Sequence, residues 1–128
     1  MFAAMRSERM EALHLYSDPA TGLEAVVAIH NTKLGPALGG CRYLAYNSLD
    51  DALADAMRLA RGMSYKAALA GLEQGGGKAV ILRQPHVADR AALFEAFGRC
   101  IESLRGGYIT AVDSGTSSAD MDCIAQHT

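Results

Sequence analysis

Residues 64–82 read SYKAALAGLEQGGGKAVIL, and this stretch runs through a helix, a break and a strand in direct succession. The alanine-rich part predicts a helix over residues 63–72, because alanine and leucine favour helical backbone. Three successive glycines at positions 75–77 are expected to break regular structure. The apolar residues 79–82 then predict a short strand, so the whole stretch favours an α/β fold.

The segment upstream of this stretch predicts three further strands. Residues 13–16 and 23–30 are expected as strands, since the second is apolar and rich in β-branched side chains. Residues 18–22, DPATG, have turn chemistry and predict that these two strands form a hairpin. Residues 35–40, GPALGG, are expected to form an irregular loop because of their glycine content, and residues 41–46 a third strand.

Two long helices are expected, one before the glycine run and one after it. Ser48 is a good N-cap for the first, and Asp89 for the second. Glycines at 106–107 predict the end of the second helix, and residues 108–112 form a last apolar strand. A further helix is expected after Asp120. Strands that alternate with helices in this way indicate an α/β domain.

The composition fits a single globular domain and excludes several classes of partner. The net charge of the 128 residues is −2 with no run of Lys or Arg, so no nucleic-acid partner is expected. No apolar stretch approaches the roughly 20 residues that span a bilayer, so no membrane is expected either. The cysteines, Cys41, Cys100 and Cys123, are odd in number and widely spaced. They predict no disulfide framework and no metal site, and they fit a reducing, cytoplasmic setting.

Lysines are rare in this sequence, and two of the three flank the glycine run. Lys66 and Lys78 lie on either side of it, while Lys33 lies apart. Glycines let a ligand approach the backbone closely. A lysine that is partly desolvated or near another cation can act as a base near neutral pH, and a second lysine can hold a carboxylate. The alternative, equally open from spacing alone, is that Lys78 caps a turn and Lys66 is a solvated helix residue.

Asp113 is the third candidate, because it follows the last predicted strand. Sites in open α/β sheets gather at strand ends, where an acid can exchange a proton. A loop-capping Asx turn is the alternative role for this residue. A phosphate loop at GGGK is a further, less favoured hypothesis, since the pattern would require Gly at Leu72 and a hydroxyl residue at Ala79. The dinucleotide fingerprint G-x-G-x-x-G is also absent from the chain.

Four ordered blocks of sequence resemble one known family. They are LGPALGGCRYLAY (34–46), DALADAMRLARGMSYKAALAGL (51–72), GGGKAVI (75–81) and YITAVDSGTSSADMD (108–122). These blocks resemble the N-terminal domain of the glutamate/leucine/phenylalanine/valine dehydrogenases, and leucine dehydrogenase-like members most. The resemblance implies that residues 1–128 form one substrate-binding and dimerisation domain with a mixed sheet of about five strands flanked by helices. It also implies a C-terminal Rossmann domain that this chain lacks.

The family resemblance implies reversible, NAD-dependent oxidative deamination of an L-amino acid to a 2-oxo acid and ammonia. Lys66 would hold the substrate carboxylate, Lys78 would be the base that activates water, and Asp113 would exchange a proton with the substrate nitrogen. The remaining implied pocket residues are Gly39, Gly40 and Met63 around the carboxylate and Cα, and Leu38 and Ala111 against the side chain. NAD would be bound mainly by the missing domain, so this chain alone is expected to be inactive.

The substrate class follows from one position in the first block. Glutamate-using relatives place a lysine where this chain has Leu38, so the resemblance implies an apolar, branched-chain L-amino acid or its 2-oxo acid. Cys41 departs from the family, where threonine is common. The family also implies a homo-oligomer, at least a dimer. The alternative hypothesis is a truncated, non-catalytic oligomerisation module of the same fold.

Overall fold

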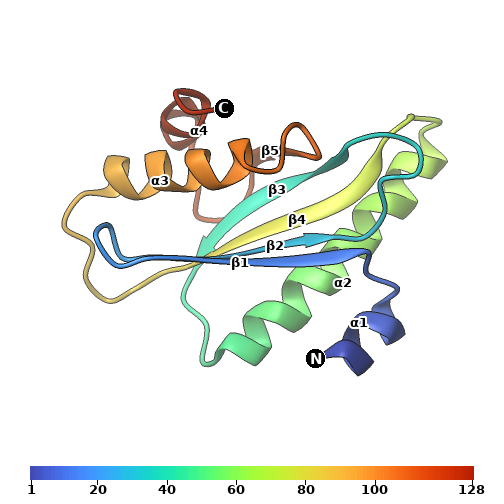
Figure 1. The fold of residues 1–128 in the computed structure, drawn as a ribbon, viewed down its shortest axis with the longest axis horizontal. Coiled ribbons are helices and arrows are strands. Elements are labelled where there is room, and N and C mark those ends of the chain that lie inside the picture. Colours follow the sequence, from blue (N-terminus) through green and yellow to red (C-terminus); the bar gives the residue numbers. More distant parts are fainter.

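The computed structural model describes all residues from 1 to 128, and Figure 1 shows a sheet with helices on both faces. The elements in chain order are α1 (Phe2–Glu8), β1 (Ala12–Asp18), β2 (Leu23–Ile29), β3 (Ala37–Leu44), α2 (Leu49–Leu69), β4 (Gly75–Leu82), α3 (Arg90–Glu102), β5 (Tyr108–Val112) and α4 (Ser118–Ala125). None of these helices is long and apolar enough to cross a membrane.

The five strands form one mixed sheet in the order β1-β2-β4-β3-β5. β1 pairs antiparallel with β2, and β2 antiparallel with β4, which confirms the predicted hairpin. β3 runs parallel to both β4 and β5, so β3 lies between the glycine run and the last strand. The predicted α/β class with about five strands in a mixed sheet is therefore confirmed.

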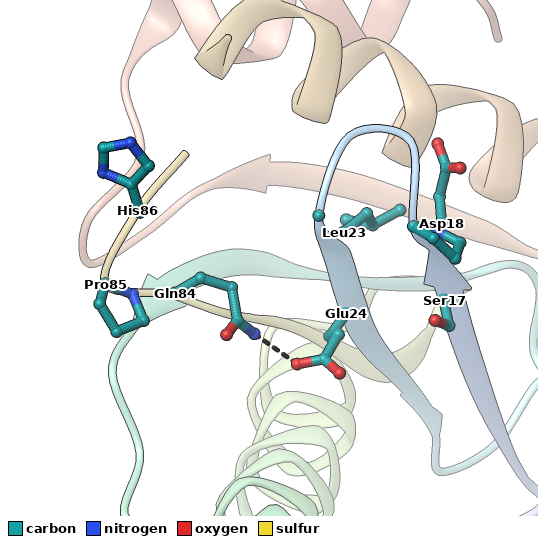
Figure 2. Close-up of a pocket in the computed structure, with 9 residues that line it drawn as sticks. Ser17, Asp18, Leu23, Glu24, Gln84, Pro85 and His86 are labelled. Carbon is teal, nitrogen blue, oxygen red and sulfur yellow. Dashed lines mark hydrogen bonds between the residues drawn. The ribbon is translucent and has the colours of Figure 1, made fainter. Parts of the chain in front are cut away.

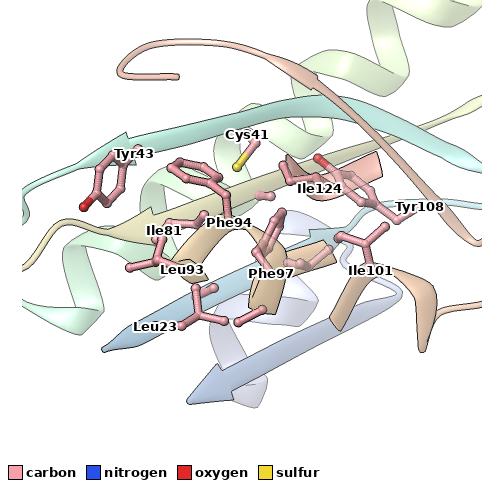
Figure 3. Close-up of a cluster of buried hydrophobic side chains, with 14 of the residues drawn as sticks. Leu23, Cys41, Tyr43, Ile81, Leu93, Phe94, Phe97, Ile101, Tyr108 and Ile124 are labelled. Atoms are coloured by element: carbon pink, nitrogen blue, oxygen red, sulfur yellow. The ribbon is translucent and has the colours of Figure 1, made fainter. Parts of the chain in front are cut away.

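The two faces of the sheet bury two separate apolar cores. In β2, Ala25 and Val27 belong to the core under α3 and α4, while Val26 and Ala28 belong to the core under α2. Figure 3 shows the larger core, in which Phe97 of α3 lies among strand residues and Ile124 of α4. Burial on both faces explains why β2 is continuously apolar, as is usual for a central strand.

Both predicted helix caps are confirmed. The Ser48 hydroxyl accepts a hydrogen bond from the Asp51 N–H at 3.1 Å, and the Asp89 carboxylate accepts one from the Ala92 N–H at 3.1 Å. These caps satisfy backbone donors that have no partner within the helix. α2 continues through Gly62 and ends at Leu69, where we expected Leu72.

The glycine-rich segments differ from the prediction. Residues 37–40 belong to β3 and residues 75–77 to β4, so neither segment is an irregular loop or a break. The reason is space: a Cβ on Gly76 would overlap backbone atoms of α2, and one on Gly39 would overlap the Gly77 carbonyl. Glycine here lets two strands and a helix approach closely, which propensity alone does not reveal.

Two further boundaries differ from those expected, and one helix was not expected at all. β3 ends at Leu44 and not at residue 46, and α4 begins at Ser118, before Asp120. The α4 cap is Ser117, whose hydroxyl accepts the Asp120 N–H while the Asp120 carboxylate accepts the Ser117 N–H. This reciprocal pair is a capping box, which shows that Asp120 lies within the first turn and does not precede it. The N-terminal α1, which carries no buried residue, was not predicted.

The close approach at Gly76 can be tested by adding one methyl group. We expect Gly76→Ala to lower the free energy of unfolding by about 1–3 kcal/mol, because its Cβ would overlap the Ser64 nitrogen and the Ala60 oxygen. Gly62→Ala is the matched control. A Cβ there meets nothing within 4 Å, so this change should raise stability by about 0.5–1 kcal/mol. Denaturant unfolding of both variants measures the difference, and equal stability would contradict this account of the glycine run.

Candidate active site

The structure brings all the sequence-predicted site residues to one pocket of about 550 Å³. The pocket lies between α2 and the strands β3, β4 and β5, where the two parallel strand pairs meet. Its predicted members are Leu38, Gly39, Gly40, Met63, Lys66, Lys78, Ala111 and Asp113. Residues far apart in the sequence therefore share one cavity.

Lys78 and Asp113 form an ion pair on the wall of this pocket. Lys78 belongs to β4 and leaves only 7% of its side chain exposed, and Asp113 follows β5 with 19% exposed. The Lys78 ammonium donates to Asp113 Oδ2. A buried ammonium needs such a partner, because desolvation of an isolated charge is strongly unfavourable. The placement rules out the alternative that Lys78 caps a turn, since it lies within a strand.

The two glycines of β3 make room for this ion pair. A Cβ on Gly40 would lie 2.7 Å from the Asp113 Cβ and would overlap its carboxylate. Tyr108, fully buried below, donates its hydroxyl to the Gly39 carbonyl at 2.8 Å. The backbone of β3 is thus fixed from below and carries no side chain where Asp113 turns inward.

A short loop holds the backbone of Asp113 in place. The Asp113 N–H donates to Thr116 Oγ1 at 2.9 Å, and this hydroxyl donates to the Cys41 carbonyl at 2.9 Å. The Ser114 N–H donates to Asp113 Oδ1 at 2.7 Å. The predicted Asx turn is not observed, because Asp113 Oδ1 accepts from the adjacent Ser114 N–H and not from the residue two positions on. This loop contact and the Lys78 pair use different carboxylate oxygens.

The charge state of Asp113 follows from these neighbours. Partial burial raises the pKa of the carboxyl, but the hydrogen bonds from Lys78 and the Ser114 N–H, with the nearby Arg42 cation, lower it more. The net result is a pKa below the usual aspartate value. Asp113 is accordingly a carboxylate at neutral pH and can accept a proton.

Lys66 occupies the opposite wall, in the last turn of α2. It is exposed, and no acidic side chain of this chain pairs with it. Lys66 is thus a solvated helix residue, as the alternative prediction had it, and it also lines the pocket. An unpaired ammonium on the wall of a pocket can hold an anionic group as a point charge.

Sequence reasoning missed five residues that also line the pocket. They are Arg42, Arg58, Leu59, Gly62 and Val112. Helical spacing could have identified the α2 members, since residues 58, 59 and 62 share a face with Met63 and Lys66. Arg42 could have been found from β3, because it lies two residues beyond Gly40 on the same face.

A second hollow, of about 500 Å³, lies beside the β1–β2 turn and is shown in Figure 2. Its two carboxylates are already engaged: Asp18 accepts the Thr21 hydroxyl at 2.9 Å, and Glu24 accepts the Gln84 side-chain amide. No lysine or arginine lines it. No three His, Cys, Asp or Glu side chains of the chain cluster as metal ligands. The pocket around Lys78 is therefore the better candidate for chemistry.

Comparison with known sequences identifies the family. Residues 9–128 match the family described as Glu/Leu/Phe/Val dehydrogenase, dimerisation domain. The chain is 53% identical over 128 residues to leucine dehydrogenase from Geobacillus stearothermophilus, which covers 100% of this chain and 35% of that protein. It is 54% identical over 116 residues to valine dehydrogenase from Streptomyces coelicolor, covering 91% of this chain and 32% of that protein. The chain thus spans about a third of the length of these curated relatives.

Solved structures agree with this match. L-tryptophan dehydrogenase from Nostoc punctiforme superposes with a TM-score of 0.94 at 41% identity, covering 99% of this chain and 38% of that one. A hetero-hexameric glutamate dehydrogenase from Thermus thermophilus shares the fold, with a TM-score of 0.79 at 23% identity over 92% of this chain and 30% of that one. The chain belongs to the Glu/Leu/Phe/Val dehydrogenase family, and it matches the dimerisation domain of that family.

Proposed function

We propose that this chain is the substrate domain of an enzyme that oxidatively deaminates an apolar, branched-chain L-amino acid with NAD. One observation carries the proposal: the buried Lys78–Asp113 pair shares a pocket with the unpaired Lys66. An amino acid carries a carboxylate and a nitrogen on one carbon. The pocket offers a free cation for the first group and a carboxylate for the second.

The substrate carboxylate is assigned to Lys66. Its ammonium is exposed and free of acidic partners, so a bound carboxylate would be its first ionic contact. Gly39 and Gly40 carry no side chain on the facing wall, which lets the Cα of a substrate approach the backbone. Met63 contributes an apolar surface between them. This arrangement fixes the reacting carbon near Lys78.

Proton transfer is assigned to the buried pair. Asp113, held as a carboxylate, exchanges a proton with the substrate nitrogen. Lys78 must first release to solvent the ammonium proton that it shares with Asp113. As the neutral amine it then takes a proton from the water that adds to the imino carbon. Each residue thus acts at one atom: Asp113 at the nitrogen, Lys78 at the attacking oxygen.

NAD would supply the hydride acceptor that this oxidation of the amino acid requires. The residues of this chain do not fit a dinucleotide site, because G-x-G-x-x-G is absent and the pocket lining contains no equivalent turn. We therefore assign the nucleotide to residues outside this chain and expect these 128 residues alone to produce no NADH.

Self-association forms a further part of the proposal, as a homo-oligomer of at least two copies. β1 forms one edge of the sheet, and Leu15 on that strand is 56% exposed. An open strand edge can pair with a second chain. The description of the matched family as a dimerisation domain agrees with this. The alternative function, a non-catalytic oligomerisation module, would need the open edge of β1 but not the buried Lys78–Asp113 pair. The effect of the lysine variants on catalysis, described below, therefore separates the two functions.

The two lysines should fail in different ways. In the full-length protein, Lys78→Ala should lower kcat by about 10²–10⁴-fold with a smaller change in KM, because a general base acts in the transition state. Lys66→Ala should mainly raise KM, because it removes a ground-state contact to the substrate carboxylate. Lys33→Ala is the matched control, since Lys33 is exposed and outside the pocket. Steady-state kinetics with leucine and NAD measures all three, and the reverse pattern would exchange the two assignments.

The substrate class depends on Leu38 and Ala111. A leucine side chain gains about 1.5–3 kcal/mol in an apolar pocket, whereas a buried unpaired carboxylate is disfavoured by several kcal/mol. We expect kcat/KM for leucine and valine to exceed that for glutamate by at least about 100-fold. Leu38→Lys should narrow this ratio, while Leu34→Lys, at an exposed position 60% accessible to solvent, should not. A substrate panel decides this, and a preference of the unmodified enzyme for glutamate would overturn the apolar pocket.

A further inference from the structure

Arg42 lies between two carboxylates at the edge of the candidate active site. It belongs to β3, two residues after Gly40, and 24% of its side chain is exposed. Its Nη1 lies 3.4 Å from Asp55 Oδ2, and its Nε lies 3.5 Å from Asp113 Oδ1. The guanidinium thus connects the helix α2 to the loop after β5.

The two oxygens of Asp113 have different partners. Oδ2 accepts from Lys78, while Oδ1 accepts from the Ser114 N–H and faces Arg42 Nε. Arg42 Nε is buried and makes no hydrogen bond, and the Asp113 carboxylate lies 3.5 Å from it. Two cations therefore approach the carboxylate from opposite oxygens, which restrains its rotation about the Cβ–Cγ bond.

Arg42 is itself held in place by a network on α2. Asp55 accepts the Tyr46 hydroxyl at 2.6 Å and Arg58 Nη2 at 2.8 Å, in addition to Arg42. Burial and the hydrogen bond to Asp55 raise the pKa of Tyr46 to about 12, so the phenol stays protonated and keeps donating. Although burial raises the pKa of Asp55, Tyr46, Arg58 and Arg42 lower it more, and Asp55 stays ionised. The network gives Arg42 a fixed anchor away from the substrate.

We propose that Arg42 is a positioning residue for Asp113, holding Oδ1 so that Oδ2 faces Lys78 and the substrate nitrogen. This inference rests on the proposed function, in which Asp113 must start as a carboxylate. Arg42 contributes in two ways: its position fixes the orientation of the carboxylate, and its positive charge favours the ionised form. It acts through Asp113 and contacts no reacting atom.

Loss of the Arg42 charge should change the pKa of Asp113 in one direction only. Asp113 has a lowered pKa, and removing one of the cations that lower it must raise this value. Asp113 would then stay protonated up to a higher pH, and the acidic limb of the kcat/KM profile would move upward. The other charged or titratable groups near Asp113 stay in place: Lys78 on β4, Cys41 and Tyr108 below, Asp120 on α4, and Arg58 and Lys66 on α2. Burial raises the pKa of Cys41 and of Tyr108, so both remain neutral over this range.

The test compares Arg42→Gln with Arg42→Lys in the full-length enzyme. Arg42→Gln should lower kcat about 10- to 100-fold, leave KM for leucine within about threefold, and move the acidic limb to higher pH. Arg42→Lys should restore the acidic limb, because it restores the charge, with partial recovery of kcat. Arg83→Gln is the matched control: Arg83 lies over the Tyr43 ring, outside the pocket, and all three quantities should be unchanged.

Two results would overturn the proposal. An unmoved acidic limb in Arg42→Gln, with no recovery in Arg42→Lys, would mean that Arg42 only supports the fold. A raised KM with unchanged kcat would mean that Arg42 binds substrate directly. A carboxyl titration by ¹³C NMR of labelled Asp113, in wild type and Arg42→Gln, needs no turnover. It tests the Arg42 contact even if the wild-type enzyme oxidises no amino acid, which would be a failure of the proposed function alone.

Discussion

The buried Lys78–Asp113 ion pair is the constraint on which the surrounding structure depends. Its two members come from β4 and from the loop after β5, and β3 lies between these strands. A side chain on β3 at this point would separate them, which is why Gly40 faces the carboxylate. Burial of an ion pair adds little to stability by itself, so the glycines, the Tyr108 hydroxyl below and the Thr116 loop are best understood as support for its geometry.

Much of the fold follows from local pattern. The caps Ser48 and Asp89, the DPATG turn and the apolar strand 108–112 each depend on neighbouring residues only, and each was predicted from them. The glycine-rich parts of β3 and β4 were not. Glycine propensity favours a break, but here the close approach of β3, β4 and α2 outweighs it, and that approach is a tertiary property.

The site residues also divide into those that the sequence indicates and those that only the tertiary structure reveals. Lys66, Lys78 and Asp113 stand out in the sequence because they are rare or lie at element ends, and the family resemblance assigned them roles. Strand alternation from Gly40 could place Arg42 at the pocket, but nothing in the sequence pairs it with Asp113. Its proximity to Asp113 depends on the parallel register of β3 with β5, in which Gly40 lies opposite Ala111. Only the assembled sheet shows that contact.

The charge balance of the pocket explains why such support is needed. Four cationic side chains, Arg42, Arg58, Lys66 and Lys78, line it with a single carboxylate, Asp113. Asp55 engages two of these cations from outside the pocket lining, and Asp113 pairs with the third. Lys66 is the only one of these four cations that forms no salt bridge with a carboxylate. Lys66 is therefore the cation most available to an anion that enters the pocket, because the other three already form salt bridges with Asp55 or Asp113. Under the proposed function, this arrangement would orient the substrate carboxylate toward Lys66.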